Sequence, residues 1–231
     1  MNVILITGTS KGIGRYLAEY YLFKNNTVIG CSRSESTIKH ENYNHIIADI
    51  SNEKEILNIY LFIRKNFKKL DVLINNAGIN PSILSAALLP ASLIKKVYEV
   101  NVFASMLFCR EAVKMMALKK TGRIINIGSM ATKHEVKGES LYTSTKAAMI
   151  AYSKVLAKEV YKMGITVNVV APSVVETELS MKINQIALQE VLNRNAISHY
   201  GKMEDISNVI DLLIEEKSSA ITGQLIFLGG V

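Results

Sequence analysis

The chain has 231 residues, of which 49% are hydrophobic and 20% are charged, a balance typical of a globular protein with a sizeable core. Its formal net charge is +7, but the basic residues are spread along the chain without interleaved aromatic residues, which argues against a nucleic-acid-binding protein. The positive charge instead favours an anionic cofactor and an acidic substrate or carrier.

Membrane and secretory signals are not evident in the sequence. Apolar runs stay below the length of about 18 residues that a membrane span requires, and the first residues lack the basic start of a signal peptide. The two cysteines, Cys31 and Cys109, make neither a disulfide framework nor a metal-ligand cluster. We therefore expect a cytoplasmic protein without a bound metal.

Apolar runs of strand length alternate with longer stretches of helical spacing. In chain order, the sequence predicts a strand at 2–7, a helix ending near 24, strands at 27–31 and 45–48, a helix at 53–67, a strand at 71–75, a long helix at about 91–118, a strand at 123–127, a long helix at 141–163, a strand at 165–170, an irregular helix at about 178–193, a helix at 204–215 and a last strand at 224–228.

Apolar strands that are separated by helices indicate a parallel sheet covered on both faces. Right-handed crossovers then give an α/β fold of the Rossmann-type, doubly wound class, with a seven-stranded parallel sheet in three layers. No linker divides the chain, so we expect a single domain over residues 1–231. Two helical stretches, 104–109 and 147–152, are apolar or small on all sides, and we expect them to pack also against a second subunit.

A glycine-rich turn follows the first predicted strand and opens a helix. Glycines let backbone N–H groups approach a pyrophosphate, and the helix N-terminus points at the same phosphates. A plain strand-to-helix turn is the alternative, but the position after an N-terminal apolar strand favours phosphate binding. The predicted contacts come from Gly8, Ser10, Lys11, Gly12, Ile13 and Gly14.

The residues after the second predicted strand indicate which dinucleotide binds. A carboxylate there would bind the ribose 2′-hydroxyl of NAD and repel the 2′-phosphate of NADP. The chain has Ser32 and Arg33, with no acid before Glu35, and arginine forms a fork to phosphate. With Lys11 as a second cation, this pattern predicts NADP(H); solvated surface charges are the alternative.

Tyr142 and Lys146 stand four residues apart in a predicted helix and share one face. A neighbouring ammonium and an oxidised nicotinamide both favour the phenolate, so we expect the pKa of Tyr142 to fall and its hydroxyl to act as an acid/base toward a carbonyl. Ser129 follows a strand at the carboxyl edge of the sheet, and we expect it to hold the carbonyl oxygen beside Tyr142. The tyrosine–lysine pair alone is a weak signal.

The joint pattern resembles the short-chain dehydrogenase/reductase family over essentially the whole chain. The resemblance rests on residues in the family's order: the turn 7–14, Asp49, Asn75, Asn76, Ala77, Gly78, Asn101, Ser129, Tyr142, Lys146, Pro172 and Thr177.

This resemblance implies a role for each matching residue. Ser129, Tyr142 and Lys146 would form a catalytic triad, and Asn101 would be a fourth catalytic residue that holds a water linking Lys146 to solvent. Cofactor contacts are implied for Asp49 and its neighbour Ile50 at adenine, for Asn76, Ala77 and Gly78 on the adenosine side, for Tyr142 and Lys146 at the nicotinamide end, and for Pro172, Val175 and Thr177 near the carboxamide.

Several of these residues also have structural interpretations. Asn101 could cap or kink its helix, and Asp49 could belong to the N-cap region of the next helix. Asn75 and Asn76 could be turn residues, and we expect at least one to be structural. Ser173 departs from the family, which usually has glycine after this proline; if that position requires positive φ, serine would strain or shift the loop.

Within the family, the chain resembles bacterial 3-oxoacyl-[acyl-carrier-protein] reductases at 122–127, 164–172 and 221–224. Because these segments mostly build the sheet and the subunit interface, they indicate ancestry better than substrate. An acidic carrier protein requires a basic surface near the site. Candidates for that surface, with solvated helix lysines as the equal alternative, are Lys119, Lys120, Lys158 and Lys162.

The substrate is expected to be chosen by a lid inserted at about 174–200 and by an opposing wall at 80–93. Apolar residues in the lid segment favour an acyl or other apolar substrate, although they could simply pack on the core. They are Leu179, Met181, Ile183, Ile186, Leu188 and Leu192.

These observations favour an NADPH-dependent carbonyl reductase that transfers hydride to a ketone, with a 3-oxoacyl thioester as the leading substrate. The alternative is an NADP-dependent ketoreductase or dehydrogenase acting on a sugar, polyol or specialised metabolite. A scaffold or sensor without turnover is a third hypothesis, against which the presence of Tyr142 and Lys146 argues. The expected partners are a small-molecule or carrier-bound carbonyl substrate and further copies of the chain, in a tetramer or dimer.

Overall fold

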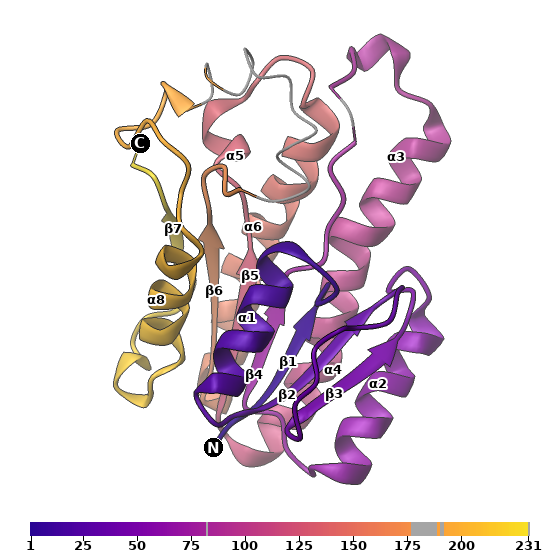
Figure 1. The fold of residues 1–231 in the computed structure, drawn as a ribbon, viewed down its shortest axis with the longest axis vertical. Helices are drawn as coiled ribbons and strands as arrows, with labels where there is room; N and C mark the ends of the chain where they lie inside the picture. The colour runs from indigo at the N-terminus through magenta and orange to yellow at the C-terminus, as the bar shows by residue number, and fades with distance from the viewer. Residues whose placement is uncertain (82, 177–188, 190–191, 231) are drawn as a thin grey trace.

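The computed structural model describes residues 1–81, 83–176, 189 and 192–230. Within them, seven strands form one parallel sheet in the order β3-β2-β1-β4-β5-β6-β7. The predicted doubly wound α/β fold is therefore confirmed. Figure 1 shows the strands with their carboxyl ends toward the top of the view. Their bounds are β1 Val3–Thr7, β2 Thr27–Ser32, β3 Tyr43–Ile47, β4 Val72–Asn75, β5 Gly122–Ile127, β6 Ile165–Ala171 and β7 Leu225–Phe227.

Helices cover both faces of the sheet and produce three layers (Figure 1). On one face, α1 (Gly12–Phe23) and α8 (Met203–Ile214) bury Leu17, Tyr21 and Ile210 against the strands. On the other face, α2 (Glu53–Asn66), α4 (Ala104–Lys119) and α6 (Ser140–Val160) do the same. Shorter helical pieces are η1 (Ala86–Leu88), α3 (Ala91–Tyr98), η2 (Glu99–Phe103), α5 (Ala131–His134), η3 (Tyr161–Met163) and η5 (Glu216–Ser218).

The strand β3 begins at Tyr43, two residues before the start predicted from the sequence. It is an edge strand that pairs only with β2 among the described strands. Its side chains are half-buried or exposed, whereas those of β1, β2, β4, β5 and β6 are buried. A search for apolar runs therefore missed the first two residues of β3, Tyr43 and Asn44.

The long helix predicted at 91–118 is interrupted, so that expectation is wrong in detail. After α3, the five residues of η2 form a π-helical segment before α4 begins. Asn101 lies in this segment, and its buried side chain bonds the backbone of Ile79 on both sides: Nδ2 donates to the carbonyl (2.9 Å), and Oδ1 accepts from the amide (2.8 Å). Such π segments often occur at functional sites.

The four lysines proposed for a basic surface lie at the wrong edge of the sheet. Lys119 and Lys120 end α4 just before β5 begins, and Lys158 and Lys162 precede β6. A Cβ on Gly164 would lie 2.0 Å from the Lys120 carbonyl oxygen, so the two turns touch at the amino ends of the strands. The six residues of β5 separate this edge from Ser129 by about 20 Å.

The two apolar stretches predicted to reach a second subunit are only partly turned outward. Ala104, Phe108, Cys109 and Met149 are buried within the chain's own core. An outward apolar face remains on η2 and α6, which we call the α6 face and which consists of Phe103, Ala147, Ala151 and Val155.

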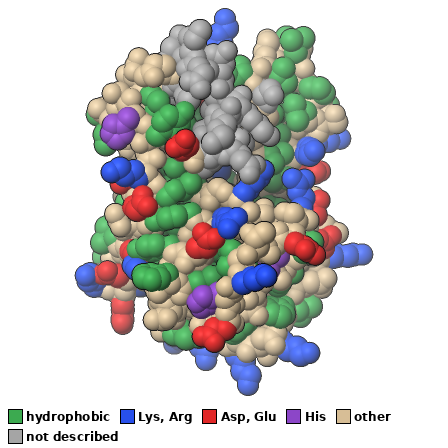
Figure 2. All heavy atoms as spheres, in the orientation of Figure 1, with side chains coloured by type: hydrophobic (Ala, Val, Ile, Leu, Met, Phe, Trp, Pro, Cys, Tyr) green, Lys and Arg blue, Asp and Glu red, His purple; other side chains and the backbone are tan. Residues whose placement is uncertain are grey.

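The surface carries charges of both signs. On the face in Figure 2, described Lys and Arg side chains are interspersed with Asp and Glu. Among the described residues, no helix has the length and apolar character needed to cross a membrane, and no cluster of three or more His, Cys, Asp or Glu side chains is arranged to hold a metal ion.

Candidate active site

A cavity of about 950 Å³ opens at the carboxyl ends of the strands. Its lining comes from the segments that follow β1 to β6, which is where open α/β sheets bind ligands. Most residues selected from the sequence line it: Gly8, Ser10, Lys11, Gly12, Ile13, Ser32, Arg33, Asp49, Ile50, Asn76, Ala77, Gly78, Ser129, Tyr142, Lys146, Pro172 and Val175.

Two selected residues do not line the cavity, and a third lies outside the described residues. Gly14 lies behind the glycine turn, and Asn101 lies behind Gly78 and Ile79. Thr177 falls outside the described residues, as do the helix expected at about 178–193, apart from 189, 192 and 193, and most of the expected lid. The opposing wall expected at 80–93 does contribute to the lining, through Asn80, Pro81, Ile83 and Leu93.

The glycine turn has the shape that a phosphate group requires. Gly8 adopts φ +77°, and Gly12, which begins α1, adopts φ +58°. A Cβ on Gly14 would lie 2.3 Å from the Gly8 carbonyl oxygen, so only glycine permits this close approach of helix to turn. Because Gly12 and Ile13 line the cavity, the N-terminus of α1 borders it, as anion binding requires. The turn therefore fits a dinucleotide pyrophosphate.

Thr7 and Asn76 fasten the turn to the segment after β4. Thr7 Oγ1 accepts from the amides of Asn76 (3.0 Å) and Ala77 (2.9 Å), and Asn76 Nδ2 donates to the Thr7 carbonyl (2.8 Å). Asn75 instead points into the core and donates to Asn126 Oδ1 (2.8 Å). Asn75 is thus structural, in line with the expectation that at least one of the two asparagines is.

One end of the cavity, which we call the Arg33 end, is formed by Lys11, Ser32, Arg33, Ser34 and Asp49. Arg33 follows β2 and is exposed. The Asp49 carboxylate accepts hydrogen bonds from the amide and hydroxyl of Ser51; these bonds first, and the charge of Arg33 after them, lower its pKa. The N-cap of α2 is Asn52, so Asp49 is not the cap itself. The sequence analysis missed Lys96 of α3, which also lines the cavity.

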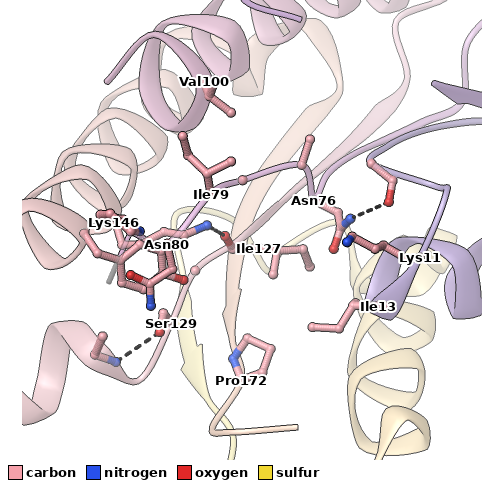
Figure 3. Close-up of a pocket in the computed structure, with 18 of the residues that line it drawn as sticks. Lys11, Ile13, Asn76, Ile79, Asn80, Val100, Ile127, Ser129, Lys146 and Pro172 are labelled. Carbon is pink, nitrogen blue, oxygen red and sulfur yellow. Dashed lines mark hydrogen bonds between the residues drawn. The ribbon is translucent and has the colours of Figure 1, made fainter. Parts of the chain in front are cut away.

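Ser129, Tyr142 and Lys146 meet at the other end (Figure 3 shows Ser129 and Lys146 there, and Lys11 and Asn76 opposite). Lys146 is buried, its Nζ donates to the Ile127 carbonyl (2.8 Å), and the same atom lies 5.8 Å from the centroid of the Tyr142 ring. Ser129 Oγ accepts from the amide of Ala131 (3.1 Å).

Burial dominates the protonation of this pair. It lowers the pKa of Lys146 to about 8. It also raises the pKa of Tyr142 to about 12; a hydrogen bond with Ser129 lowers that value, and the charge of Glu139 raises it. Burial thus opposes the fall in the tyrosine pKa that a neighbouring ammonium and an oxidised nicotinamide are expected to produce.

Glu139 and Asn80 are polar wall residues that the sequence analysis missed. Both are half-buried and line the cavity. Burial raises the pKa of the Glu139 carboxyl, while a hydrogen bond from Asn80 lowers it. Figure 3 shows Asn80 beside Ser129 and Lys146. The spacing of Glu139, three residues before Tyr142, was the available signal, because residues three apart share a helix face.

Ser173 fits its loop without the strain considered above. It is not among the described residues with positive φ. Its Oγ accepts from Asn195 Nδ2 (2.7 Å), and Asn195 Oδ1 contacts Nε2 of His134 (2.8 Å). The serine therefore ties the segment after β6 to residues near 195.

Comparison with known proteins finds relatives along nearly the whole chain. The model of the short chain dehydrogenase family matches residues 2–187. The 3-oxoacyl-[acyl-carrier-protein] reductase FabG of Rickettsia felis is 33% identical over 232 residues, which cover 98% of this chain and 94% of the relative. FabG of Salmonella typhimurium is 30% identical over 235 residues, with 99% and 96% covered.

Solved structures give the same result. ElxO with NADP bound has a TM-score of 0.90 at 29% identity, and the match covers 98% of this chain and 96% of that one. A 4-hydroxyisoleucine dehydrogenase complexed with NADH has a TM-score of 0.89 at 30% identity, with 100% and 98% covered. The chain therefore belongs to the short-chain dehydrogenase/reductase family and is an NAD(P)-dependent oxidoreductase.

Proposed function

We propose that the protein is an NADPH-dependent carbonyl reductase that converts a ketone to a secondary alcohol. The observation that carries this proposal is the convergence of Ser129, Tyr142 and Lys146 in one cavity with a glycine turn shaped for a dinucleotide. We further propose a 3-oxoacyl thioester as substrate, because relatives at 30% identity or more bear that name. Apolar lining residues, including Ile83, Met130 and Val136, suit an acyl chain.

The preference for NADP(H) over NAD(H) is supported by charge at the Arg33 end. Arg33 and Lys11 are cations that suit a 2′-phosphate. Asp49, the acid at this end, follows β3 rather than β2, and Ser51 already occupies its Oδ1. An acid that prefers a ribose 2′-hydroxyl is expected at the end of the second strand, where this chain has Ser32 and Arg33.

At the end of the cavity where Ser129, Tyr142 and Lys146 meet, each of these side chains has its own role in the proposed proton transfer. Ser129 holds the carbonyl oxygen, and the Tyr142 hydroxyl donates its proton to that oxygen as the carbonyl becomes an alcohol. When bound, the nicotinamide cofactor supplies the hydride to the carbonyl carbon. The Lys146 ammonium then stabilises the phenolate left on Tyr142. Asn101 supports this arrangement by holding Ile79 at the cavity wall.

A polar ketone, such as a keto sugar or a hydroxylated metabolite, is the second candidate substrate. Glu139 favours it, because an alkyl chain beside this half-buried carboxyl would remove solvation that the single hydrogen bond from Asn80 replaces only in part. A substrate hydroxyl or ammonium would supply a further partner.

Assembly and location complete the proposal. The α6 face is apolar and exposed, and we propose that it packs against further copies of the chain in a dimer or tetramer. The cytoplasmic location expected from the sequence remains part of the proposal.

The test is NADPH oxidation by the purified protein with acetoacetyl thioesters, small diketones and keto sugars, each repeated with NADH. Rapid thioester turnover with NADPH supports the fatty-acyl substrate. Turnover only with keto sugars supports the polar one, and no turnover of any ketone contradicts the proposed reaction.

The mechanism is tested with Tyr142→Phe, which is expected to keep NADPH binding and lose most turnover. Tyr161→Phe is the matched control, because Tyr161 is exposed and lies in η3, before β6. Full activity in Tyr142→Phe would show the proposed mechanism to be wrong.

A further inference from the structure

Two side chains of the edge strand β3 connect the chain segments that border the Arg33 end. The Tyr43 hydroxyl donates to Thr9 Oγ1 in the glycine turn (3.0 Å). His45 Nδ1 lies 3.0 Å from the Tyr43 hydroxyl, and its Nε2 lies 2.9 Å from the Ser34 carbonyl and 3.3 Å from Ser32 Oγ. A chain of polar contacts thus runs from the glycine turn to the turn after β2.

Gly30 of β2 makes room for this chain of contacts. It stands opposite His45 in the β2–β3 register. A Cβ at Gly30 would lie 2.3 Å from the Tyr43 hydroxyl oxygen and 2.5 Å from Thr9 Oγ1. Because glycine weakens a strand interior, its presence here is explained by the close approach of these side chains.

The imidazole holds the backbone on the C-terminal side of Arg33. A carbonyl oxygen only accepts hydrogen bonds, so His45 Nε2 carries a hydrogen and donates to Ser34. Ser32 Oγ donates to the same carbonyl (2.7 Å), which closes the turn around Arg33. An arginine on a fixed backbone loses less conformational freedom when its guanidinium binds an anion.

We infer that His45 is a positioning residue for cofactor selection, which holds the Ser32–Ser34 turn so that Arg33 faces the 2′-phosphate of NADP(H). This inference rests on the proposed NADP(H) preference. It assigns the selection of the phosphate to a side chain of β3, which does not line the cavity itself.

The experiment measures binding of adenosine 2′,5′-bisphosphate and of 5′-AMP by isothermal titration calorimetry, so that no turnover is involved. The wild type is expected to bind the bisphosphate more tightly. In His45→Ala, bisphosphate affinity is expected to fall about tenfold, as for loss of one hydrogen bond that orders a charged group, with 5′-AMP affinity unchanged. In His45→Gln, the side-chain amide replaces Nε2–H as donor, and most of the loss is recovered.

Two further variants provide an independent test of the inference and a control. Gly30→Ala is expected to displace the Tyr43 hydroxyl and to weaken bisphosphate binding as His45→Ala does. His199→Ala, at an exposed histidine bonded only to the neighbouring Tyr200 carbonyl among the described contacts, is the control and is expected to bind both nucleotides like the wild type.

The experiment distinguishes failure of the proposed NADP(H) preference from failure of the role inferred for His45. A wild type that binds both nucleotides equally overturns the NADP(H) preference and the inference with it. A preference that survives intact in His45→Ala overturns the inference alone. Equal weakening of both nucleotides in His45→Ala, without recovery in His45→Gln, also overturns it, because it indicates a general structural role.

Discussion

Lys146 imposes a stability cost that one substitution is expected to reveal. Its side chain is buried, and burial lowers its pKa from 10.5 to about 8. At pH 7 the lysine is charged in both the folded and the unfolded chain, so the folded state carries the full penalty of burying the ammonium. The difference between 10.5 and about 8, at about 1.4 kcal/mol per pKa unit, corresponds to about 3 kcal/mol.

Lys146→Met removes this charge and keeps a side chain of similar length. It also leaves the Ile127 carbonyl without the Nζ donor, at a cost of about 1 kcal/mol. The variant is therefore expected to be more stable by about 2 kcal/mol at pH 7, equivalent to about 4–8 °C in Tm for a chain of this length. Turnover is expected to be lost.

The pH dependence provides the sharper test. A folded pKa below the unfolded one means that the stability of the wild type is highest above pH 10.5 and falls as the pH drops through about 8. The advantage of Lys146→Met should thus shrink as the pH rises above about 8 and reverse at about pH 10, where the remaining penalty falls below the about 1 kcal/mol lost with the hydrogen bond. Urea unfolding at pH 7, 9 and 10.5 measures it, and the exposed Lys154→Met on the same helix is the control. A Met variant less stable at pH 7, or an advantage independent of pH, would refute the reasoning.

Three further predictions concern the cofactor, the catalytic tyrosine and the assembly. Arg33→Asp should raise the KM for NADPH much more than that for NADH in steady-state assays; an unchanged preference removes Arg33 from the 2′-phosphate site. Glu139→Gln removes a charge that raises the pKa of Tyr142, so the pH–rate profile of alcohol oxidation, which needs the phenolate, should move to lower pH; an unmoved profile would separate the two groups. Phe103→Glu should reduce the assembly size in light scattering, whereas Phe23→Glu, at a phenylalanine of α1 that is even more exposed (87% against 53%), should not; equal behaviour of the two variants contradicts an interface on the α6 face.

The alternation of strands and helices was predictable because each buried strand is apolar on both faces. The same logic placed the start of β3 two residues too late, because none of its side chains is fully buried and the strand begins at Tyr43. The π segment at Asn101 was also beyond prediction. The buried side chain of Asn101 within it bonds Ile79, a residue from another loop, and no local periodicity records that contact.

The residues of the candidate site also divide into those that the sequence could predict and those that it could not. Residues next to the ends of strands, such as Gly8, Ser129 and Arg33, could be assigned because parallel strands bring their carboxyl ends to one edge. Glu139 and His45 were not predicted as site residues, because their importance comes from partners distant in the sequence, Asn80 and Ser34.

The protonation of Tyr142 and Lys146 could not be predicted from the sequence either, because it depends on how deeply the fold buries them. Sequence spacing places an ammonium one helical turn from a phenol and so predicts mutual stabilisation of their charged forms. In the folded chain, however, burial disfavours the charged form of each: the pKa of Lys146 falls to about 8 and that of Tyr142 rises to about 12. At neutral pH the tyrosine therefore keeps the proton that ketone reduction consumes, while the lysine remains charged close to its own pKa. The protonated hydroxyl is ready to donate to a ketone, and a rise in pH through about 8 removes the ammonium before the tyrosine ionises, so reduction should slow there while the hydroxyl is still intact.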